Sequence, residues 1–180
     1  MKATGIVRRI DDLGRVVIPK EIRRTMRIRE GDPLEIYTDN DGEVIFKKYS
    51  PIGELGIFAA QYADVLYKTS GLPVVVGDRD HVIAAAGLPK KEVLERRAAP
   101  ALEEIMESRQ SYILENPQSS PVYAVEGYDR PAAAVYPILA AGDVCGAVIL
   151  SAGEDRRQPS EADRKLIAAA AMFLGRQMEE

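Results

Sequence analysis

The 180-residue chain has no tryptophan, a single histidine, His81, and a single cysteine, Cys145. One cysteine cannot close a disulfide within the chain, and such sparse thiol usage is typical of a reducing cytoplasm, which is the location we expect. A zinc-type site needs several histidine or cysteine ligands, so we expect His81 to be a surface or turn residue. A resolving thiol pair and a histidine-based triad are also missing. The sequence therefore predicts neither an enzyme nor a cofactor.

Long hydrophobic runs are also missing. No apolar stretch approaches the roughly 20 residues that a membrane-spanning helix needs, and the opening Met-Lys-Ala-Thr-Gly has no apolar signal core. We therefore expect no membrane partner. Cys145 sits within an apolar, strand-like run, so we expect it to be a buried small hydrophobe rather than a reactive thiol.

The charge is unevenly distributed along the chain. The net charge is −4, yet residues 1–50 carry 11 Lys and Arg against 9 Asp and Glu, whereas residues 51–180 carry 13 against 19. Within residues 2–29 the count is 9 basic against 3 acidic side chains. A phosphate backbone responds to local charge rather than to the whole-chain average. The N-terminal segment is therefore predicted to bind a polyanion, and we expect double-stranded DNA.

The basic segment has a recognisable local pattern. Residues 4–10 and 16–18 are rich in β-branched side chains and predict two short strands, joined by a turn over residues 11–14. Pro19 suits the first turn of a helix that carries several arginines away from its apolar face. The alternation that follows predicts a hairpin with strands over 34–38 and 43–49.

These elements form a small ββαββ domain over residues 1–52. About 50 residues rarely bury enough apolar surface to stay folded as a single chain, so pairing of two copies is expected. The helical pattern that begins after Ser50-Pro51-Ile52-Gly53 marks the boundary to a second domain over residues 53–180.

The second domain reads as an α+β structure. Its pattern predicts one helix near residues 55–69, an interrupted helix over 90–109 and a final helix capped by Ser160. Strands are expected over 73–76, 82–86, 111–114, 134–139 and 144–150, the last two forming an apolar hairpin. Helices segregated from antiparallel strands indicate an α+β sandwich. A 3-4-3-4 stripe on the first helix is compatible with a dimer seam or with packing on its own domain; it comprises Leu55, Phe58, Tyr62, Val65 and Thr69.

The N-terminal residues resemble the AbrB family of bacterial transition-state regulators. The resemblance lies in Thr4-Gly-Ile-Val-Arg-Arg, Asp12-Leu-Gly-Arg-Val-Val-Ile-Pro19 and Glu21-Ile-Arg-Arg24. It implies a swapped-hairpin β-barrel in which two chains interleave their strands as an intertwined homodimer that binds double-stranded DNA. The DNA-contacting arginines of the family map to Arg8, Arg15, Arg23 and Arg24. Peripheral phosphate contacts are expected from Lys2, Arg9, Lys20 and Arg27.

The C-terminal domain is similar to GAF domains through the hairpin Tyr136-Pro-Ile-Leu, Gly142 and Gly146-Ala-Val-Ile. This resemblance implies joining of two dimers into a homotetramer through helices, and it leaves open a role in sensing an unidentified small molecule. Residues that could line a cavity or form ordinary core are Val74, Val76, Tyr112, Val135 and Tyr136. The implied function is a DNA-binding transcription regulator of sporulation or growth-phase genes. The alternative is an antitoxin that uses the swapped-hairpin fold and binds a partner toxin.

Overall fold

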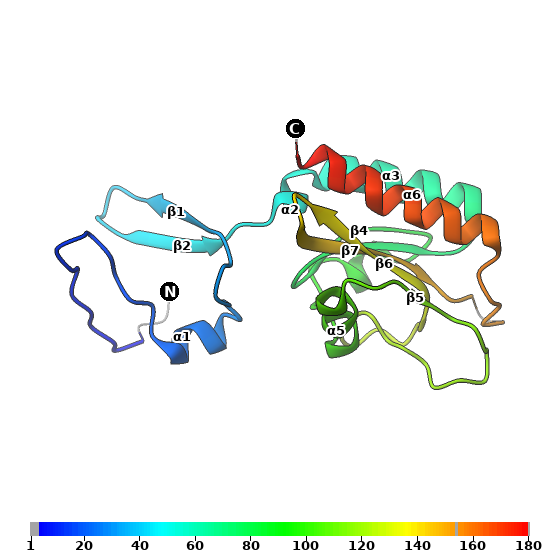
Figure 1. The fold of residues 1–180 in the computed structure, drawn as a ribbon, viewed down its shortest axis with the longest axis horizontal. Helices are drawn as coiled ribbons and strands as arrows, with labels where there is room; N and C mark the ends of the chain where they lie inside the picture. The colour runs from blue at the N-terminus through cyan, green and yellow to red at the C-terminus, as the bar shows by residue number, and fades with distance from the viewer. Residues whose placement is uncertain (1–3, 154, 180) are drawn as a thin grey trace. The chain divides into compact units, whose positions relative to one another are not determined.

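The computed structural model describes residues 4–153 and 155–179. The chain divides into two compact units, Met1–Tyr49 and Ser50–Glu180. The domain boundary predicted between residues 52 and 53 falls inside helix α2 (Pro51–Glu54), just after this division. Figure 1 shows the elements of both units, which are described separately below.

The N-terminal unit contains one helix and one hairpin. Helix α1 spans Lys20–Thr25. Strands β1 (Leu34–Thr38) and β2 (Val44–Lys48) pair antiparallel, with Ile36 opposite Phe46. The hairpin therefore forms as the alternation predicted. In this unit the described residues form no other strand ladder.

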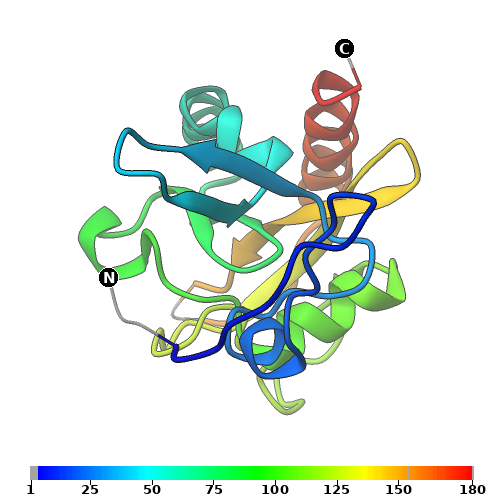
Figure 2. The ribbon, with the colours of Figure 1, turned by 90° about the vertical axis from the view of Figure 1, so that its left-hand side faces the viewer.

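The predicted strands over residues 4–10 and 16–18 are not formed in the single chain. This segment is an extended loop without strand arrows in Figures 1 and 2, where it is dark blue. A β-strand is stabilised by hydrogen bonds to a neighbouring strand, and the described part of this chain offers none here. The strand prediction is therefore wrong for the isolated chain, although the β-branched composition that prompted it is present.

The N-terminal unit also buries very little. Pro19 is the sole buried residue among residues 4–49. Large apolar side chains lie exposed on the unpaired segment, with Val7 87% and Val17 73% accessible. Further exposed members of this set are Ile6, Ile10, Leu13 and Val16. Exposed apolar side chains this dense mark a surface that another chain covers.

The C-terminal unit is built around a five-stranded antiparallel sheet of order β4-β3-β7-β6-β5. The strands pair through the central β3–β7 and β6–β7 ladders. Their bounds are β3 Val74–Asp78, β4 Val82–Ala86, β5 Tyr112–Ile113, β6 Ala132–Ala140 and β7 Asp143–Ser151. The predicted strands and the α+β class are confirmed, with ends that differ by a few residues.

Helices cover the two faces of this sheet. Helices α3 (Gly56–Ser70) and α6 (Glu161–Gln177) lie side by side on one face, and α5 (Pro100–Ser108) lies on the other (Figures 1 and 2). Each face has its own buried cluster, with Leu66 and Ile167 in the first and Leu102 and Met106 in the second. Among the described residues, no helix has both the length and the hydropathy needed to cross a bilayer.

The structure refines two helix predictions. The buried residues of α3 are Ala59, Ala63 and Leu66, whereas Val65 of the predicted stripe is 59% exposed. Phe58 and Tyr62 of the stripe pack against the buried cluster beneath this helix, whereas Val65 and Thr69 are exposed. The stripe is therefore divided between packing on its own domain and a surface open to another chain. The helix predicted over residues 90–109 is limited to α4 (Lys90–Val93) and α5, because the chain bridges to neighbouring segments between them.

Candidate nucleic-acid interface

A tight turn positions the first of the DNA-contact candidates. The Asp11 Oδ1 atom accepts hydrogen bonds from the backbone nitrogens of Leu13 (3.0 Å) and Arg15 (2.8 Å). The Gly14 nitrogen donates to the Asp11 carbonyl at 3.0 Å, and Gly14 takes a φ of 75° that favours glycine. The turn predicted from the sequence therefore forms within one chain, without help from a strand partner.

The same carboxylate holds the Arg15 side chain. Arg15 Nε donates to Asp11 Oδ2 at 2.8 Å, and the Arg15 side chain remains 69% exposed. Hydrogen bonds from the backbone and then the side chain of Arg15 lower the pKa of Asp11 below its ordinary value. Asp11 thus stays ionised and fixes the direction in which the Arg15 guanidinium leaves the turn.

Helix α1 presents the next group of cations. Pro19 precedes its first residue with a φ of −58°, and Glu21 lies in the first turn, where the helix dipole favours an acid. Arg23 and Arg24 occupy the last turn and are exposed. In the described part of the chain, no hydrogen bond or ion pair neutralises the side chains of Arg8, Arg9, Arg23 or Arg24. These guanidinium groups are free to meet an external anion.

The end of α1 is attached to the hairpin by a contact that the sequence did not reveal. Lys48 Nζ, on β2, donates to the Arg27 carbonyl at 3.1 Å and lies 3.8 Å from Asp32 Oδ2. The Asp32 side chain is only 3% exposed, and its Oδ2 accepts from the Arg29 nitrogen at 2.8 Å. The sequence holds no local pattern for this contact, because Lys48 and Arg27 are 21 residues apart.

The candidate DNA-binding residues therefore lie on three segments of one chain. Arg8 and Arg9 are exposed on the extended segment, Arg15 is at the turn, and the remaining described candidates belong to α1 or its end: Lys20, Arg23, Arg24 and Arg27. Arg27 is partly buried and has a φ of 51°. Lys2 lies outside the described residues.

The candidate cavity residues of the C-terminal unit do not gather around one space. Val74 and Val76 belong to the buried cluster beneath α3 and α6, whereas Val135 belongs to the cluster on the opposite face. Tyr136 packs against the first cluster and Tyr112 against the second. Of the two interpretations left open by the sequence, the structure favours ordinary core packing.

His81 and Cys145 occupy unremarkable positions. His81 forms an isolated β-bridge with Arg97, and its backbone nitrogen donates to Asp78 Oδ1 at 2.6 Å. Cys145 is partly rather than fully buried on β7. Burial raises the pKa of its thiol above the ordinary value, so the nucleophilic thiolate is disfavoured there.

Two family models match adjacent parts of the chain. The model described as "Stage V sporulation protein T C-terminal, transcription factor" matches residues 54–179. The model described as "Antidote-toxin recognition MazE, bacterial antitoxin" matches residues 7–53. The two matched ranges correspond closely to the C-terminal and N-terminal units of the structure.

Individual proteins agree with this division. The chain is similar to AbrB, the transition state regulatory protein of Bacillus subtilis (strain 168), with 65% identity over 51 residues, covering 28% of this chain and 52% of AbrB. The C-terminal unit is similar to the GAF domain of a phosphoenolpyruvate-protein phosphotransferase from Coxiella burnetii. That match has 15% identity and a TM-score of 0.56, and it covers 69% of this chain and 82% of the other. At this identity it shows the fold alone, which confirms the GAF-like prediction.

One relative extends over both units. Stage V sporulation protein T of Bacillus subtilis (strain 168) is 54% identical over 182 residues, which covers 100% of each chain. The match runs through both the N-terminal basic unit and the C-terminal GAF-like unit, in the same order. Together with the family model over residues 54–179, this match shows that the chain belongs to the stage V sporulation protein T family.

Proposed function

We propose that the chain is a transcription regulator whose N-terminal units bind double-stranded DNA as an intertwined homodimer. The observation that carries this proposal is a set of exposed arginines on a unit that buries almost nothing of its own. In the part of the chain that the structure describes, Arg8, Arg23 and Arg24 have no acidic partner, and Arg15 is held by Asp11. Arg8, Arg15, Arg23 and Arg24 are the proposed principal contacts. Peripheral phosphate contacts come from Lys2, Arg9, Lys20 and Arg27.

Dimerisation follows from the segment at residues 4–19, whose apolar side chains are uncovered and whose backbone lacks a strand partner in the described chain. Its apolar side chains, including Val7 and Val17, are exposed, and its backbone has no ladder partner in the described chain. A second copy supplies an identical segment, so pairing the two satisfies both at once and closes a barrel. The same pairing brings two sets of arginines onto one assembly.

The mode of DNA recognition follows from the size of α1. Six residues make a helix of about 9 Å, which is too short to place a row of side chains along a major groove. Arginine can instead grip phosphate oxygens bidentately, or guanine edges where the groove is accessible. We therefore propose phosphate anchoring combined with a response to DNA shape and flexibility.

The α3 and α6 surface is the proposed contact between two dimers. Ile57 and Val65 on α3 are 82% and 59% exposed, and Met172 on α6 is 75% exposed. Phe173 lies between the two helices, with its ring centroid 5.5 Å from that of Tyr62. A second copy of this two-helix face would cover these side chains and produce a homotetramer.

The biological setting is proposed from the family. Membership of the stage V sporulation protein T family supports regulation of genes used in spore development. The alternative function, an antitoxin, is supported by the MazE-type match over residues 7–53. An antitoxin that wraps its toxin uses a disordered tail, whereas this chain has a packed unit at that place. Co-purification of a small toxin would favour the alternative.

The proposal is tested by removing the two arginine charges of α1 and measuring DNA affinity across salt concentrations. If the dimer neutralises about six phosphates, the slope of log affinity against log salt is about −5. The double variant Arg23→Ala/Arg24→Ala removes four cations from a dimer, so we expect about 100-fold weaker binding and a slope near about −2.

The control removes two neighbouring cations elsewhere. Lys90→Ala/Lys91→Ala changes the exposed helix α4 by the same charge, and we expect the DNA affinity and the salt slope to stay as in the wild type. Unchanged affinity in a folded Arg23→Ala/Arg24→Ala protein would remove the DNA-binding role from α1. If both double variants lost DNA affinity equally, the loss would be explained by the overall charge of the protein and not by the position of the arginines.

A further inference from the structure

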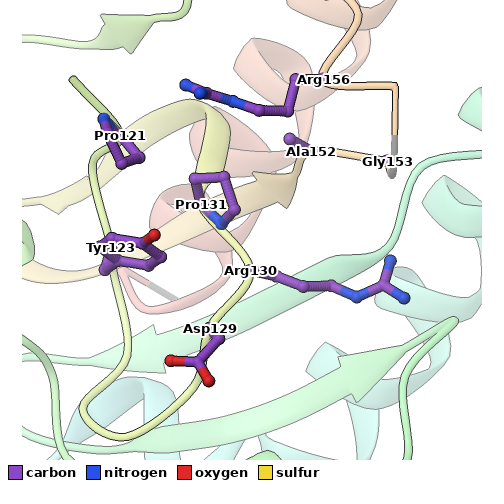
Figure 3. A pocket seen from close by; sticks show the side chains of 8 residues that line it. All are labelled: Pro121, Tyr123, Asp129, Arg130, Pro131, Ala152, Gly153 and Arg156. Atoms are coloured by element: carbon purple, nitrogen blue, oxygen red, sulfur yellow. The ribbon is translucent and has the colours of Figure 1, made fainter. Parts of the chain in front are cut away.

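A pocket of about 340 Å³ in the C-terminal unit lies between the loop before β6 and the segment after β7 (Figure 3). Its described lining contains both Asp129 and Arg130 beside proline and tyrosine rings, so it does not select a ligand of one charge. A more specific arrangement lies in the N-terminal unit, at the end of helix α1. There a lysine of the hairpin contacts the turn that ends the helix carrying Arg23 and Arg24.

Helix α1 is too short and too exposed to be held in place by its own structure. It has six residues, and none of them is buried. An isolated helix of this length is unstable in water, because its few hydrogen bonds do not offset the cost of nucleation. Within one chain, the contacts at the ends of α1 therefore decide where Arg23 and Arg24 lie.

The last turn of α1 closes with two hydrogen bonds that use the carbonyl groups of these two arginines. The Ile28 nitrogen donates to the Arg23 carbonyl at 2.8 Å, and the Arg27 nitrogen donates to the Arg24 carbonyl at 3.3 Å. This pair of bonds is a Schellman motif, in which the residue after the helix is left-handed and most often glycine. Here that residue is Arg27, with a φ of 51°. A residue with a side chain is strained in this conformation, so the turn opens more readily than a glycine turn unless another contact holds it.

Lys48 of strand β2 supplies such a contact. Its Nζ atom donates to the Arg27 carbonyl at 3.1 Å, directly at the strained residue. The Asp32 carboxylate lies 3.8 Å from the same Nζ atom and accepts a hydrogen bond from the Arg29 nitrogen at 2.8 Å. The Lys48 and Asp32 side chains are only 24% and 3% exposed, so water competes little for these interactions. The lysine thus ties the strained turn to the hairpin.

The neighbouring Lys47 has the same charge but a different environment. It is exposed, and its Nζ atom lies 4.4 Å from the centroid of the Tyr37 ring. Successive side chains of a strand point to opposite faces, so Lys47 points away from the Arg27 carbonyl that Lys48 contacts. Two adjacent lysines of one strand therefore differ in their relation to α1, and Lys47 is a matched control for Lys48.

We propose that Lys48 is a positioning residue for DNA binding. Through the Arg27 carbonyl it holds the last turn of α1 in the conformation that presents Arg23 and Arg24. This inference rests on the proposed DNA-binding function and adds a residue that acts through the helix without contacting DNA itself. When the Lys48 contact is removed, the apparent DNA affinity falls in proportion to the fraction of molecules whose turn is closed.

The test measures DNA affinity and its salt dependence in full-length Lys48→Met, which keeps the apolar stem of the side chain and removes the ammonium group. If the closed turn becomes about threefold rarer in each of two protomers, DNA binding weakens about tenfold. The slope of log affinity against log salt should stay at about −5, because the bound complex makes the same phosphate contacts. If Lys48 itself contacted phosphate, the slope of the dimer would become shallower by about 2, and that result would overturn the positioning role.

Further variants separate position from charge. Lys47→Met removes the same charge from the same strand, and it should bind DNA as the wild type does. Arg27→Gly relieves the left-handed strain, so adding Lys48→Met to Arg27→Gly should weaken binding by no more than about twofold, against about tenfold in the wild-type chain. Amide hydrogen exchange at Ile28, whose nitrogen donates to the Arg23 carbonyl, reports opening of the turn and should become at least about threefold faster in Lys48→Met.

Three results would overturn the proposal. They are unchanged DNA affinity in Lys48→Met, equal losses in Lys48→Met and Lys47→Met, and an equal effect of Lys48→Met with and without Arg27→Gly. Because Lys48→Met could dissociate the dimer, ultracentrifugation follows the same samples. Dissociation of Lys48→Met alone, with the Arg27→Gly/Lys48→Met protein still a dimer, would support action through Arg27. Dissociation of both would make Lys48 a general stabiliser of the unit and would overturn the positioning role.

Failure of the proposed function is observed separately, on Arg23→Ala/Arg24→Ala. Normal DNA affinity in that double variant would remove the DNA-binding role from α1, whatever Lys48 does. Weak binding in the double variant together with normal binding in Lys48→Met would overturn the positioning role alone.

Discussion

Every buried hydrophobic side chain that the structure describes lies at or beyond Ile52, whereas Pro19 is the sole buried residue described in the N-terminal unit. The C-terminal unit thus contains its own core on both faces of a sheet. The N-terminal unit instead exposes the apolar side chains and backbone that would make a core. The comparison teaches that one unit is stabilised within the chain, while the other depends on association.

The largest effect is expected from placing a charge in the segment that needs a partner. Val17→Asp puts an ionised group where two copies are proposed to meet, and burying an unpaired charge costs several kcal/mol. We expect loss of the dimer and at least about 100-fold weaker DNA binding, while the C-terminal unit still unfolds at the wild-type urea concentration. Analytical ultracentrifugation, binding titrations and urea denaturation measure these three quantities.

The matched variant Val17→Ala separates charge from lost packing. It removes two methyl groups and should weaken the dimer only modestly. A folded, monomeric Val17→Asp protein with normal DNA affinity would contradict the dependence of the first unit on association.

The next largest effect concerns the core of the C-terminal unit alone. A methyl group added at Gly175 on α6 would collide with the carbonyl oxygen of Leu139 on β6, so the helix must move away from the sheet. We expect Gly175→Ala to lower the free energy of unfolding of this unit by about 3 kcal/mol. Urea denaturation followed by circular dichroism measures the change.

The control for this variant is another helical glycine with free space around it. A Cβ at Gly56 on α3 meets no atom within 4 Å, so Gly56→Ala should be neutral or stabilising by about 0.5 kcal/mol. Reduced DNA affinity in a Gly175→Ala protein that remains folded would show that the two units are coupled, and would weaken the comparison.

A smaller, pH-dependent effect is expected at the start of α6. Burial alone raises the pKa of Asp163, but hydrogen bonds from the Ser160 side chain and backbone and from Arg157 outweigh burial and lower it. Arg157 contacts the carboxylate at 3.0 Å, and Ser160 and Asp163 form a reciprocal capping box. This ionised carboxylate therefore stabilises the folded state at neutral pH.

Because the folded pKa lies below the unfolded value, the contribution is complete above the ordinary value of 3.8 and is lost as the pH falls through the folded pKa. Asp163→Asn should cost about 1–2 kcal/mol near pH 7 and progressively less toward about pH 3. Urea titrations across this range measure the difference. If the loss of free energy of unfolding in Asp163→Asn did not change with pH, it would come from packing and not from the charge of the carboxylate.

The smallest effect is expected at the hairpin between β6 and β7. Ala141 and Gly142 have φ values of 47° and 86°, the two positive angles of a type I′ turn. Asparagine tolerates this conformation better than alanine, so Ala141→Asn should raise the free energy of unfolding by about 0.5 kcal/mol, and the melting temperature slightly. Ala141→Val should lower it, because a β-branched side chain is strained there. Calorimetry that gives the opposite order would contradict this reading of the turn.

The sequence predicted the self-contained unit well because its signals are local. Short apolar runs bounded by turn residues place β4 and the β6–β7 hairpin, and the serine cap places the start of α6. The sequence left the role of the α3 stripe open, and the structure adds that this helix buries Ala59 and Ala63 toward the sheet, small side chains that a pattern of large apolar residues does not mark. The predicted GAF-like fold did not depend on that detail.

Other features had no signal in a single sequence. The strands predicted before α1 require hydrogen bonds from outside the described chain, so composition alone could not place them. Lys48 and Asp32 meet through tertiary contact across the hairpin. The left-handed φ of Arg156, 48°, likewise has no signal in the charged run Asp155-Arg156-Arg157.

The short extended segment ahead of α1 has a consequence for gene control. Since neither copy completes this segment alone, the number of DNA-competent molecules scales with the square of chain concentration when chains are scarce. Dilution during growth would silence the regulator sooner than a monomeric activator or repressor. Modest increases in synthesis would in turn produce a steep rise in promoter occupancy, giving a threshold without any additional signal.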